Sequence, residues 1–167
     1  WPYLAGRALG LPVVNAAVSG QGLWGAIEFA EEEVLVLEGI THCLVLIGTN
    51  DLAAYDAAKM IDRLEALFVK LRPVCEVHAG TLLPKDKSDF GDLALVHERR
   101  HAVNAWLSGE ADVAGVIDFA SVMHAPEDVD RFHAGYTEDG IHPSIEGQRV
   151  MGAYAAQVLA SLKSSGP

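Results

Sequence analysis

The sequence predicts an α/β fold, a three-layer α/β/α sandwich in which helices cover both faces of a parallel sheet. Short apolar runs alternate with longer amphipathic stretches along the 167 residues, and this alternation is typical of parallel sheets with helical crossovers. The clearest apolar run is continuous, as expected for a strand covered on both faces. No repeat, linker or low-complexity segment divides the chain, so we expect one domain over residues 1–167.

The first elements are expected to be a helix, a strand and a second helix. Residues 1–9 have the pattern of a helix that ends at Gly10, a plausible C′ residue. Residues 11–18 (LPVVNAAV) are interpreted as a buried strand. Residues 22–37 carry apolar side chains at helical spacing, which indicates a helix.

The middle of the chain is expected to form a strand, a long helix and another strand. Residues 42–47 are the continuous apolar run. Residues 56–71 give the clearest helix, because their large apolar residues make one stripe, and Pro73 ends it. Residues 74–83 are interpreted as the next strand.

The last part of the chain is expected to contain a surface loop, a helix, a strand, an irregular polar segment, a final helix and a frayed tail. These elements are placed, in that order, at residues 85–92, 95–107, 113–119, 124–138, 144–162 and 164–166.

Composition and charge narrow the class of partner. Twelve basic residues against 23 acidic ones leave a net charge of −11, which disfavours nucleic acid and anionic membrane surfaces. No apolar run is long enough to span a bilayer, so stable membrane insertion is not expected. We expect a small-molecule or acylated substrate, and a neutral one fits this charge best.

The ends and the cysteines add little about location. The chain starts at Trp1 without a methionine or a signal peptide, which we interpret as a truncated start. The sequence therefore carries no signal that assigns a localisation or an oligomeric state. Cys43 and Cys75 are too few for a disulfide scaffold or a zinc ribbon, and we expect buried free thiols.

Two glycine-containing turns follow predicted strands. Gly48-Thr49-Asn50-Asp51 is, in structural terms, a turn whose Asn or Asp caps the next helix. In functional terms, the Asn50 amide could donate a hydrogen bond to an oxyanion, with the Gly20 N–H as a second donor. Ser19 precedes Gly20, but it lacks the flanking glycines of a nucleophile elbow, so we do not assign it as the nucleophile.

Asp139-Gly140-Ile141-His142-Pro143 precedes the last predicted helix. A lone histidine on a loop is usually just solvated. An aspartate three residues before it, however, can place its carboxylate against the imidazole. Asp139 would then orient His142, which takes a proton from a hydroxyl nucleophile.

These motifs, in this order, resemble the SGNH hydrolase family, also called GDSL esterases and lipases. The resemblance covers nearly the whole chain and also includes Trp1-Pro2-Tyr3-Leu4 and Gly80-Thr81-Leu82-Leu83-Pro84. It implies a flavodoxin-like parallel sheet. It further implies that Gly20 and Asn50 form the oxyanion hole and that Asp139 and His142 are the triad acid and base.

The family's Gly-Asp-Ser-Leu block has no counterpart in these 167 residues. In relatives that block ends a central first strand, so the resemblance implies that this chain lacks both the nucleophilic serine and that strand. We expect four of the usual five strands, and negligible activity of the chain alone.

The resemblance implies hydrolysis of an ester through an acyl-enzyme, with no cofactor and no metal. Relatives cleave lipid, thioester and carbohydrate-acetyl groups. No large apolar lid is evident here, which favours short acyl groups.

Two other functions compete with this one. His97-Glu98-Arg99-Arg100-His101 matches the zinc-hydrolase pattern His-Glu-x-x-His on a predicted helix. A third ligand is not evident, and the two arginines place positive charge near a dication. A non-catalytic binding module or pseudoenzyme of the same fold is the second alternative, because the serine is missing. His42, His78, His124 and His133 show no ligand spacing and are expected to be core or surface residues.

Overall fold

The computed structural model describes residues 1–164, and it divides into two compact units. The expected tail at Ser165 and Gly166 lies outside the described residues. The two units, each built from separate stretches of chain, consist of Trp1–Asn15, Leu83–Lys87 and Ile117–Pro167 (the first unit) and of Ala16–Leu82 and Ser88–Val116 (the second unit). A single domain over residues 1–167 stays a prediction.

The second unit contains the parallel sheet. Strand β1 (His42–Val45) pairs in parallel with β2 (Glu76–Gly80), and the sheet order is β1-β2-β3. Strand β3 (Gly115–Ile117) follows a backbone hydrogen bond from Ala114 N to Val77 O, 2.8 Å long. The predicted strands at residues 42–47, 74–83 and 113–119 are therefore confirmed, each shorter than expected.

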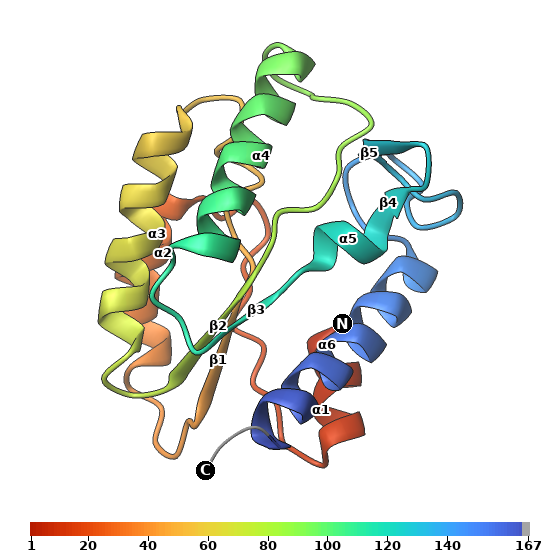
Figure 1. Cartoon of the computed structure of the whole chain (residues 1–167). Helices are drawn as coiled ribbons and strands as arrows, with labels where there is room; N and C mark the ends of the chain where they lie inside the picture. Colours follow the sequence, from red (N-terminus) through yellow and green to blue (C-terminus); the bar gives the residue numbers. More distant parts are fainter. Residues whose placement is uncertain (165–167) are drawn as a thin grey trace. The chain divides into compact units, whose positions relative to one another are not determined.

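Four helical segments belong to the second unit. They are α2 (Leu23–Phe29), a π-helical turn η1 (Ala30–Val34), α3 (Ala57–Leu71) and α4 (Leu93–Gly109). Helix α3 packs against both α2 and α4, and the three lie on one side of the sheet in Figure 1.

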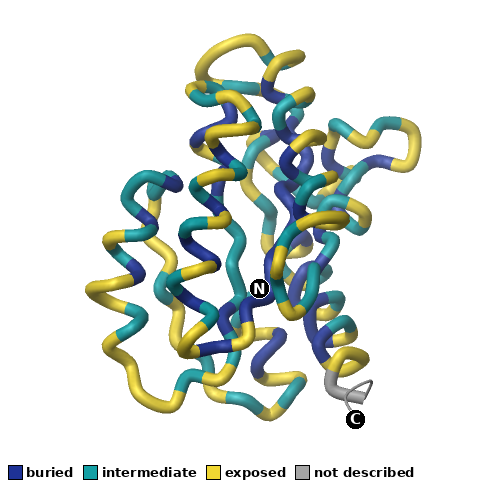
Figure 2. Tube along the Cα trace, turned by 60° about the vertical axis from the view of Figure 1, so that its left-hand side comes forward, coloured by how far each residue is buried: buried dark blue, intermediate teal, exposed yellow. Residues whose placement is uncertain are grey.

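Helix α3 shows how the sequence specifies its element. Asp56 is the N-cap, and its side chain accepts a 2.9 Å hydrogen bond from Lys59 N, which satisfies one free N–H of the first turn. The apolar stripe of α3 then faces the core. Its buried members are Met60, Leu64, Leu67, Phe68 and Leu71. The helix predicted at residues 56–71 is thus confirmed, and Figure 2 shows buried and exposed residues alternating along the helices.

The first unit contains α1 (Pro2–Leu9), α5 (Phe119–Met123), an antiparallel pair of β4 (His124–Ala125) and β5 (Asp128–Phe132), and α6 (Ile145–Ser164). Helices α1 and α6 lie side by side (Figure 1). Helix α1 ends at Gly10, whose φ of 67° is left-handed, as the sequence predicts.

A small residue lets α1 and α6 approach closely. A Cβ added at Gly152 of α6 would lie 2.5 Å from the Cβ of Leu4 and 3.2 Å from the carbonyl oxygen of Trp1. No larger residue fits this position without moving α1. Glycine, which usually weakens a helix, here permits the packing.

Residues 11–18, predicted as a buried strand, are not a strand. They have no regular structure, and Val14 and Val18 are exposed. A strand needs hydrogen bonds from a neighbour. In the part of the chain that the structure describes, no strand pairs with this segment. The parallel sheet accordingly has three strands and not the expected four.

The polar segment at residues 124–138, predicted to be irregular, contains the β4-β5 pair. The two strands are short and contain Asp128, Asp130 and Arg131, so their sequence lacks a long apolar run. The strand predicted at residues 113–119 ends earlier than expected, because a helix begins directly after it. Asp118 caps α5 by accepting a 3.3 Å hydrogen bond from Ser121 N, and Phe119 therefore begins a helix.

The cysteines form a bond that the sequence did not predict. Cys43 and Cys75 are joined by a disulfide, with 5.8 Å between their Cα atoms. The expectation of free thiols is therefore wrong. The two residues lie 32 positions apart, and only the pairing of β1 with β2 brings them together.

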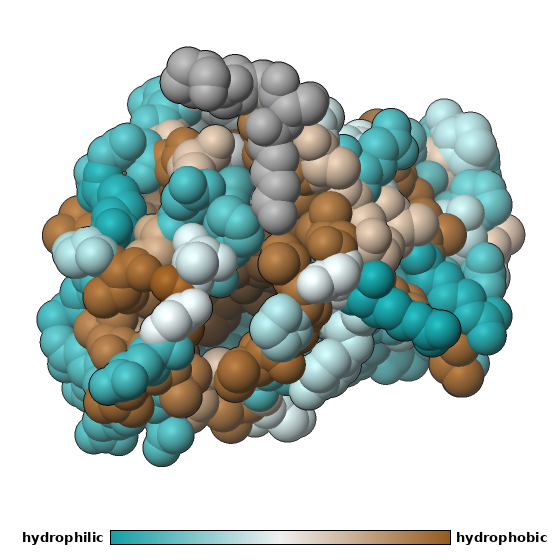
Figure 3. Space-filling view, turned by 90° about the horizontal axis from the view of Figure 1, so that it is seen from below, coloured by the Kyte–Doolittle hydropathy of each residue, from teal (hydrophilic) through white to brown (hydrophobic). Residues whose placement is uncertain are grey.

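The surface mixes polar and apolar residues, as on most proteins. Figure 3 shows hydrophobic residues reaching the surface among polar ones on one face. Among the described residues, no helix combines the length and the apolarity that crossing a membrane requires.

Candidate active site

The loop after β1 begins at a position that only glycine fits. Gly48 has a φ of 120°, which residues with a side chain rarely adopt. A Cβ there would lie 3.3 Å from the terminal methyl of Met60 and 3.5 Å from a methyl of Leu82. Gly48 therefore sets the direction in which Asn50 and Asp51 leave the sheet.

Asp51 joins this loop to helix α2. Its carboxylate oxygens lie 3.2 and 3.0 Å from the backbone nitrogen of Leu23, which donates to them. Asp51 is only 4% exposed; burial raises the pKa of its carboxyl group, and the Leu23 hydrogen bond partly opposes this. Asp51 thus caps the preceding helix, whereas Asp56 caps the next one, so the expectation that Asn or Asp of this turn caps the next helix is wrong.

Gly22 lets Asp51 reach this position. A Cβ at Gly22 would lie 2.8 Å from one carboxylate oxygen of Asp51. The glycine and the aspartate come from different loops and fit one another closely, which holds the two loops in register.

The two proposed oxyanion residues lie in these joined loops. Gly20 sits in a turn with a φ of 76°, and the Asn50 side-chain nitrogen Nδ2 donates a 3.1 Å hydrogen bond to the Gln21 carbonyl oxygen. Both residues are exposed. An amide NH2 group has two donors, so Asn50 can hold the turn with one hydrogen and offer the other.

Asp139 and His142 form a tight pair in the first unit. The Asp139 oxygen Oδ2 lies 2.7 Å from His142 Nδ1, and Oδ1 accepts hydrogen bonds from the backbone N–H groups of Ile141 and His142, at 2.9 and 2.8 Å. The His142 backbone hydrogen bond, followed by that of its ring and that of Ile141, holds the pKa of Asp139 well below its usual range. Asp139 is therefore a carboxylate that orients the His142 ring through Nδ1, so that Nε2 points away from Asp139.

The rest of the loop fixes this pair. Thr137 Oγ1 donates to the His142 carbonyl oxygen (2.8 Å) and accepts from Gly140 N (2.9 Å). Ser144 Oγ donates to the Gly135 carbonyl oxygen (2.7 Å) at the start of α6. His142 itself stays accessible, with 74% of its side chain exposed.

A family match covers most of the sequence. The model of the GDSL-like Lipase/Acylhydrolase family matches residues 1–150. The chain belongs to this family. The resemblance stated from the motifs is thereby confirmed.

Solved structures of GDSL proteins share the fold. A GDSL-like lipase from Bacteroides thetaiotaomicron is 19% identical (TM-score 0.75), and the match covers 97% of this chain and 80% of that one. A member of the lipolytic G-D-S-L family from Veillonella parvula is 21% identical (TM-score 0.72; 95% and 85% covered). A psychrotrophic esterase from Pseudoalteromonas is 16% identical (TM-score 0.70; 98% and 86% covered).

At these identities the structures establish the fold alone, and the predicted α/β fold is confirmed. No curated protein matches the chain significantly.

Within the GDSL chain, the predicted site residues fall into two pairs. Gly20 and Asn50 lie in adjoining loops of the second unit, and Asp139 and His142 are bonded in the first. The two pairs belong to different units, and the catalytic roles of all four residues stay predictions.

Asp86 is a supporting residue that the sequence did not reveal. Its side chain accepts a 2.8 Å hydrogen bond from Phe132 N, its backbone N–H donates to the Gly140 carbonyl oxygen (2.9 Å), and a Cβ at Gly140 would lie 2.9 Å from its own Cβ. Asp86 thus holds the Asp139–His142 loop against β5. In the sequence it is one polar residue of a polar loop, without any pattern.

The His-Glu-x-x-His stretch lies on α4, as predicted. Arg99 donates to the carbonyl oxygens of Leu52 and Ala53, at 2.7 and 3.1 Å, and Arg100 is buried. Among the described residues, His97 and His101 do not belong to a group of three metal-binding side chains; such a group is formed by His42, Glu76 and His78.

Proposed function

We propose that the protein is a serine-type ester hydrolase that works through an acyl-enzyme. The observation that carries the proposal is the 2.7 Å contact between Asp139 and His142 Nδ1 in a member of the GDSL family. A carboxylate on Nδ1 fixes the imidazole as a base at Nε2, which is the arrangement that hydroxyl nucleophiles need.

The reaction follows from this arrangement. A serine hydroxyl attacks the ester carbonyl carbon while His142 Nε2 takes its proton, and Asp139 stabilises the imidazolium. The tetrahedral intermediate then expels the alcohol, which receives that proton from His142. Water, activated by the same ring, hydrolyses the acyl-enzyme and regenerates the serine.

The oxyanion of this intermediate is assigned to Gly20 and Asn50. Support comes from the Asp51–Leu23 hydrogen bonds and from the Asn50–Gln21 hydrogen bond, which hold both loops before substrate binds. Donors fixed in advance need no reorganisation when the charge develops.

The nucleophile is proposed to be the serine of a Gly-Asp-Ser-Leu block, which the 167 residues do not contain. We assign it to the full-length protein outside this stretch, and we expect residues 1–167 alone to be inactive. The net charge of −11 favours a neutral ester as substrate, and we expect short acyl chains.

The test is hydrolysis of nitrophenyl esters of increasing chain length by the full-length protein. We expect His142→Ala and Asp139→Asn to lower kcat by roughly 10³–10⁴-fold, and Asn50→Ala by about 10²–10³-fold. His97→Ala, a histidine on α4, is the matched control and should leave kcat unchanged. Full activity of His142→Ala would overturn the assigned base.

A phosphonate probe that labels activated serines locates the nucleophile. Label on a Gly-Asp-Ser-Leu serine supports the proposal, whereas label on Ser19 would contradict it. A protein that binds esters without turnover and takes no label is the binding module considered above.

A further inference from the structure

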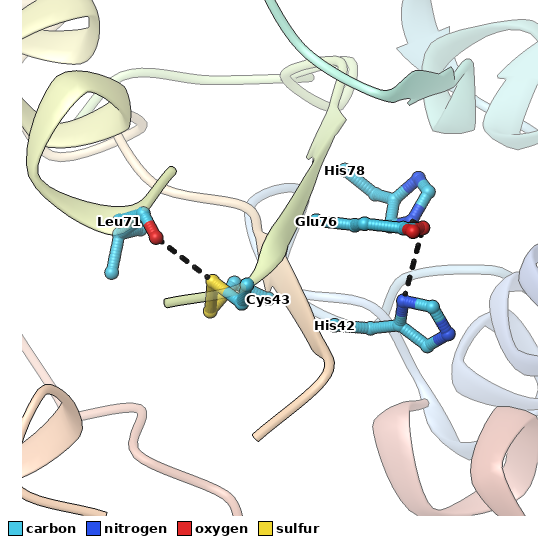
Figure 4. The surroundings of a disulfide bond; sticks show 6 residues. His42, Cys43, Leu71, Glu76 and His78 are labelled. Atoms are coloured by element: carbon cyan, nitrogen blue, oxygen red, sulfur yellow. Dashed lines mark hydrogen bonds and ion pairs between the residues drawn. A yellow bond between two sulfur atoms is a disulfide. The ribbon is translucent and has the colours of Figure 1, made fainter. Parts of the chain in front are cut away.

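Three side chains that can bind metals meet where β1 and β2 begin. His42 Nδ1 lies 3.4 Å from Glu76 Oε2, and His78 Nε2 lies 3.9 Å from the same oxygen. One ligand atom from each residue falls within 4.8 Å of the others. Figure 4 shows both rings and the carboxylate on the same side of the two strands.

The register of the sheet produces this group. His42 is the Cα partner of Glu76 in the parallel ladder, so their side chains share a face. His78 follows Glu76 by two positions and therefore points the same way. Cys43 and Cys75 are each adjacent in sequence to one of these residues and therefore point to the opposite face. There the disulfide joins the same two strands (Figure 4).

Two imidazole nitrogens in this group have no hydrogen-bond partner. Nδ1 of His42 and Nδ1 of His78 are both buried and make no hydrogen bond, although His42 Nδ1 lies 3.4 Å from Glu76 Oε2. His78 is only 3% exposed. A buried polar atom without a hydrogen bond is unfavourable, and an ion bound at His42 Nδ1 would remove this cost there. Glu76, by contrast, is exposed and can move toward a ligand.

We propose that His42, Glu76 and His78 bind a Zn²⁺ ion. Two imidazoles and one carboxylate, with a water completing the tetrahedron, form a donor set that Zn²⁺ takes in proteins. Metal–ligand bonds of about 2.0–2.2 Å place tetrahedral ligand atoms roughly 3.3–3.6 Å apart. The His42–Glu76 distance already matches this spacing. The His78 Nε2–Glu76 Oε2 distance of 3.9 Å must shorten slightly when the ion binds, and the ligand atoms of all three residues already lie within 4.8 Å of one another.

The site is distinct from the proposed ester-hydrolase residues. His42 and Glu76 are the first residues of β1 and β2, whereas Gly48 and Asn50 follow the other end of β1. The ion would therefore join the two strands and stabilise the second unit, and ester hydrolysis would not require it. Imidazole donors also disfavour Mg²⁺ and Ca²⁺, which prefer oxygen ligands.

The experiment titrates the EDTA-treated full-length protein with ZnSO4, with calorimetry and thermal unfolding as readouts. We expect one ion per chain and a Tm that rises with Zn²⁺ concentration, and no rise with MgCl2. His42→Ala and Glu76→Gln, both at positions that are not fully buried, should each weaken Kd by roughly tenfold or more. His97→Ala with His101→Ala, the other candidate pair, should leave Kd unchanged.

Co²⁺ gives an independent readout. Binding at this site should produce strong visible absorption bands of low-symmetry Co²⁺ in the wild type, and His42→Ala should lose them. Zn²⁺ binding that survives His42→Ala and Glu76→Gln, or that disappears with the α4 pair, would overturn the proposal. So would the absence of any Zn²⁺-dependent rise in Tm. None of these outcomes depends on the esterase assignment.

Discussion

The carboxylate of Asp51 accepts hydrogen bonds from the backbone N–H of Leu23, a residue 28 positions earlier in the chain. This contact joins the turn that carries Gly20 to the turn that carries Asn50. The buried Asp51 side chain thereby fixes the turns of two exposed residues, Gly20 and Asn50, although no catalytic role is assigned to Asp51 itself.

Replacing Asp51 with alanine should destabilise the protein by about 1–3 kcal/mol, because it leaves the Leu23 N–H buried without a partner. Urea unfolding measures this loss. Asp51→Asn keeps a hydrogen-bond acceptor. It also removes a carboxylate charge that burial disfavours, as the raised pKa of Asp51 indicates, so a smaller loss of stability is expected. Asp56→Ala, at the exposed N-cap of α3, is the control. It should lower stability by about 0.5–2 kcal/mol and leave the kcat of the full-length protein unchanged. Asp51→Ala should lower both stability and kcat.

The Asp139–His142 pair should persist in acid. The pKa of Asp139 is lowered from 3.8 by hydrogen bonds that only the folded loop provides. Its contribution to stability is therefore fully present above pH 3.8 and is lost as the pH falls through the lower, folded value. Carboxyl-carbon NMR should show Asp139 titrating well below the exposed aspartates. A midpoint near 3.8 would contradict the hydrogen bonding of the loop.

Substitution of Gly152 with alanine should cost about 1–3 kcal/mol, since the new methyl group would overlap Leu4 where α1 and α6 meet. Thermal unfolding measures it. Gly109→Ala, also in a helix, offers a matched control because a Cβ there meets nothing within 4 Å. That change should be neutral or stabilise by up to about 1 kcal/mol. Equal effects of the two substitutions would argue against close packing of α1 on α6.

The disulfide should contribute about 3–4 kcal/mol, because it closes a loop of 32 residues in the unfolded chain. Cys43→Ser with Cys75→Ser removes it, and guanidinium unfolding compares the variant with the oxidised and the reduced wild type. The reduced wild type and the double variant should lose similar amounts. If reduction leaves the unfolding midpoint unchanged, the two sulfurs are not bonded in solution.

Local patterns predicted the elements that depend on local interactions. Helix α3 carries its own cap at Asp56 and its own apolar stripe, so its bounds could be predicted to within a residue. The Asp139–His142 contact is likewise formed within one short loop. Here sequence spacing and spatial distance coincide.

Features that depend on pairing could not be predicted in this way. Residues 11–18 have the composition of a strand, yet a strand also needs a neighbour. The Cys43–Cys75 bond and the His42, Glu76 and His78 group both depend on the register of β1 against β2. Spacing along the chain contains no information about that register, so the histidines showed no ligand pattern.

The loop that holds Asp139 and His142 draws its stabilising contacts from Thr137, Asp86 and its own backbone. None of these partners is the proposed serine nucleophile. An acid–base pair built in this way keeps its shape whether or not a serine is available to it. A search that identifies active enzymes by this last motif would therefore also collect inactive relatives, and the search should require the serine block as well.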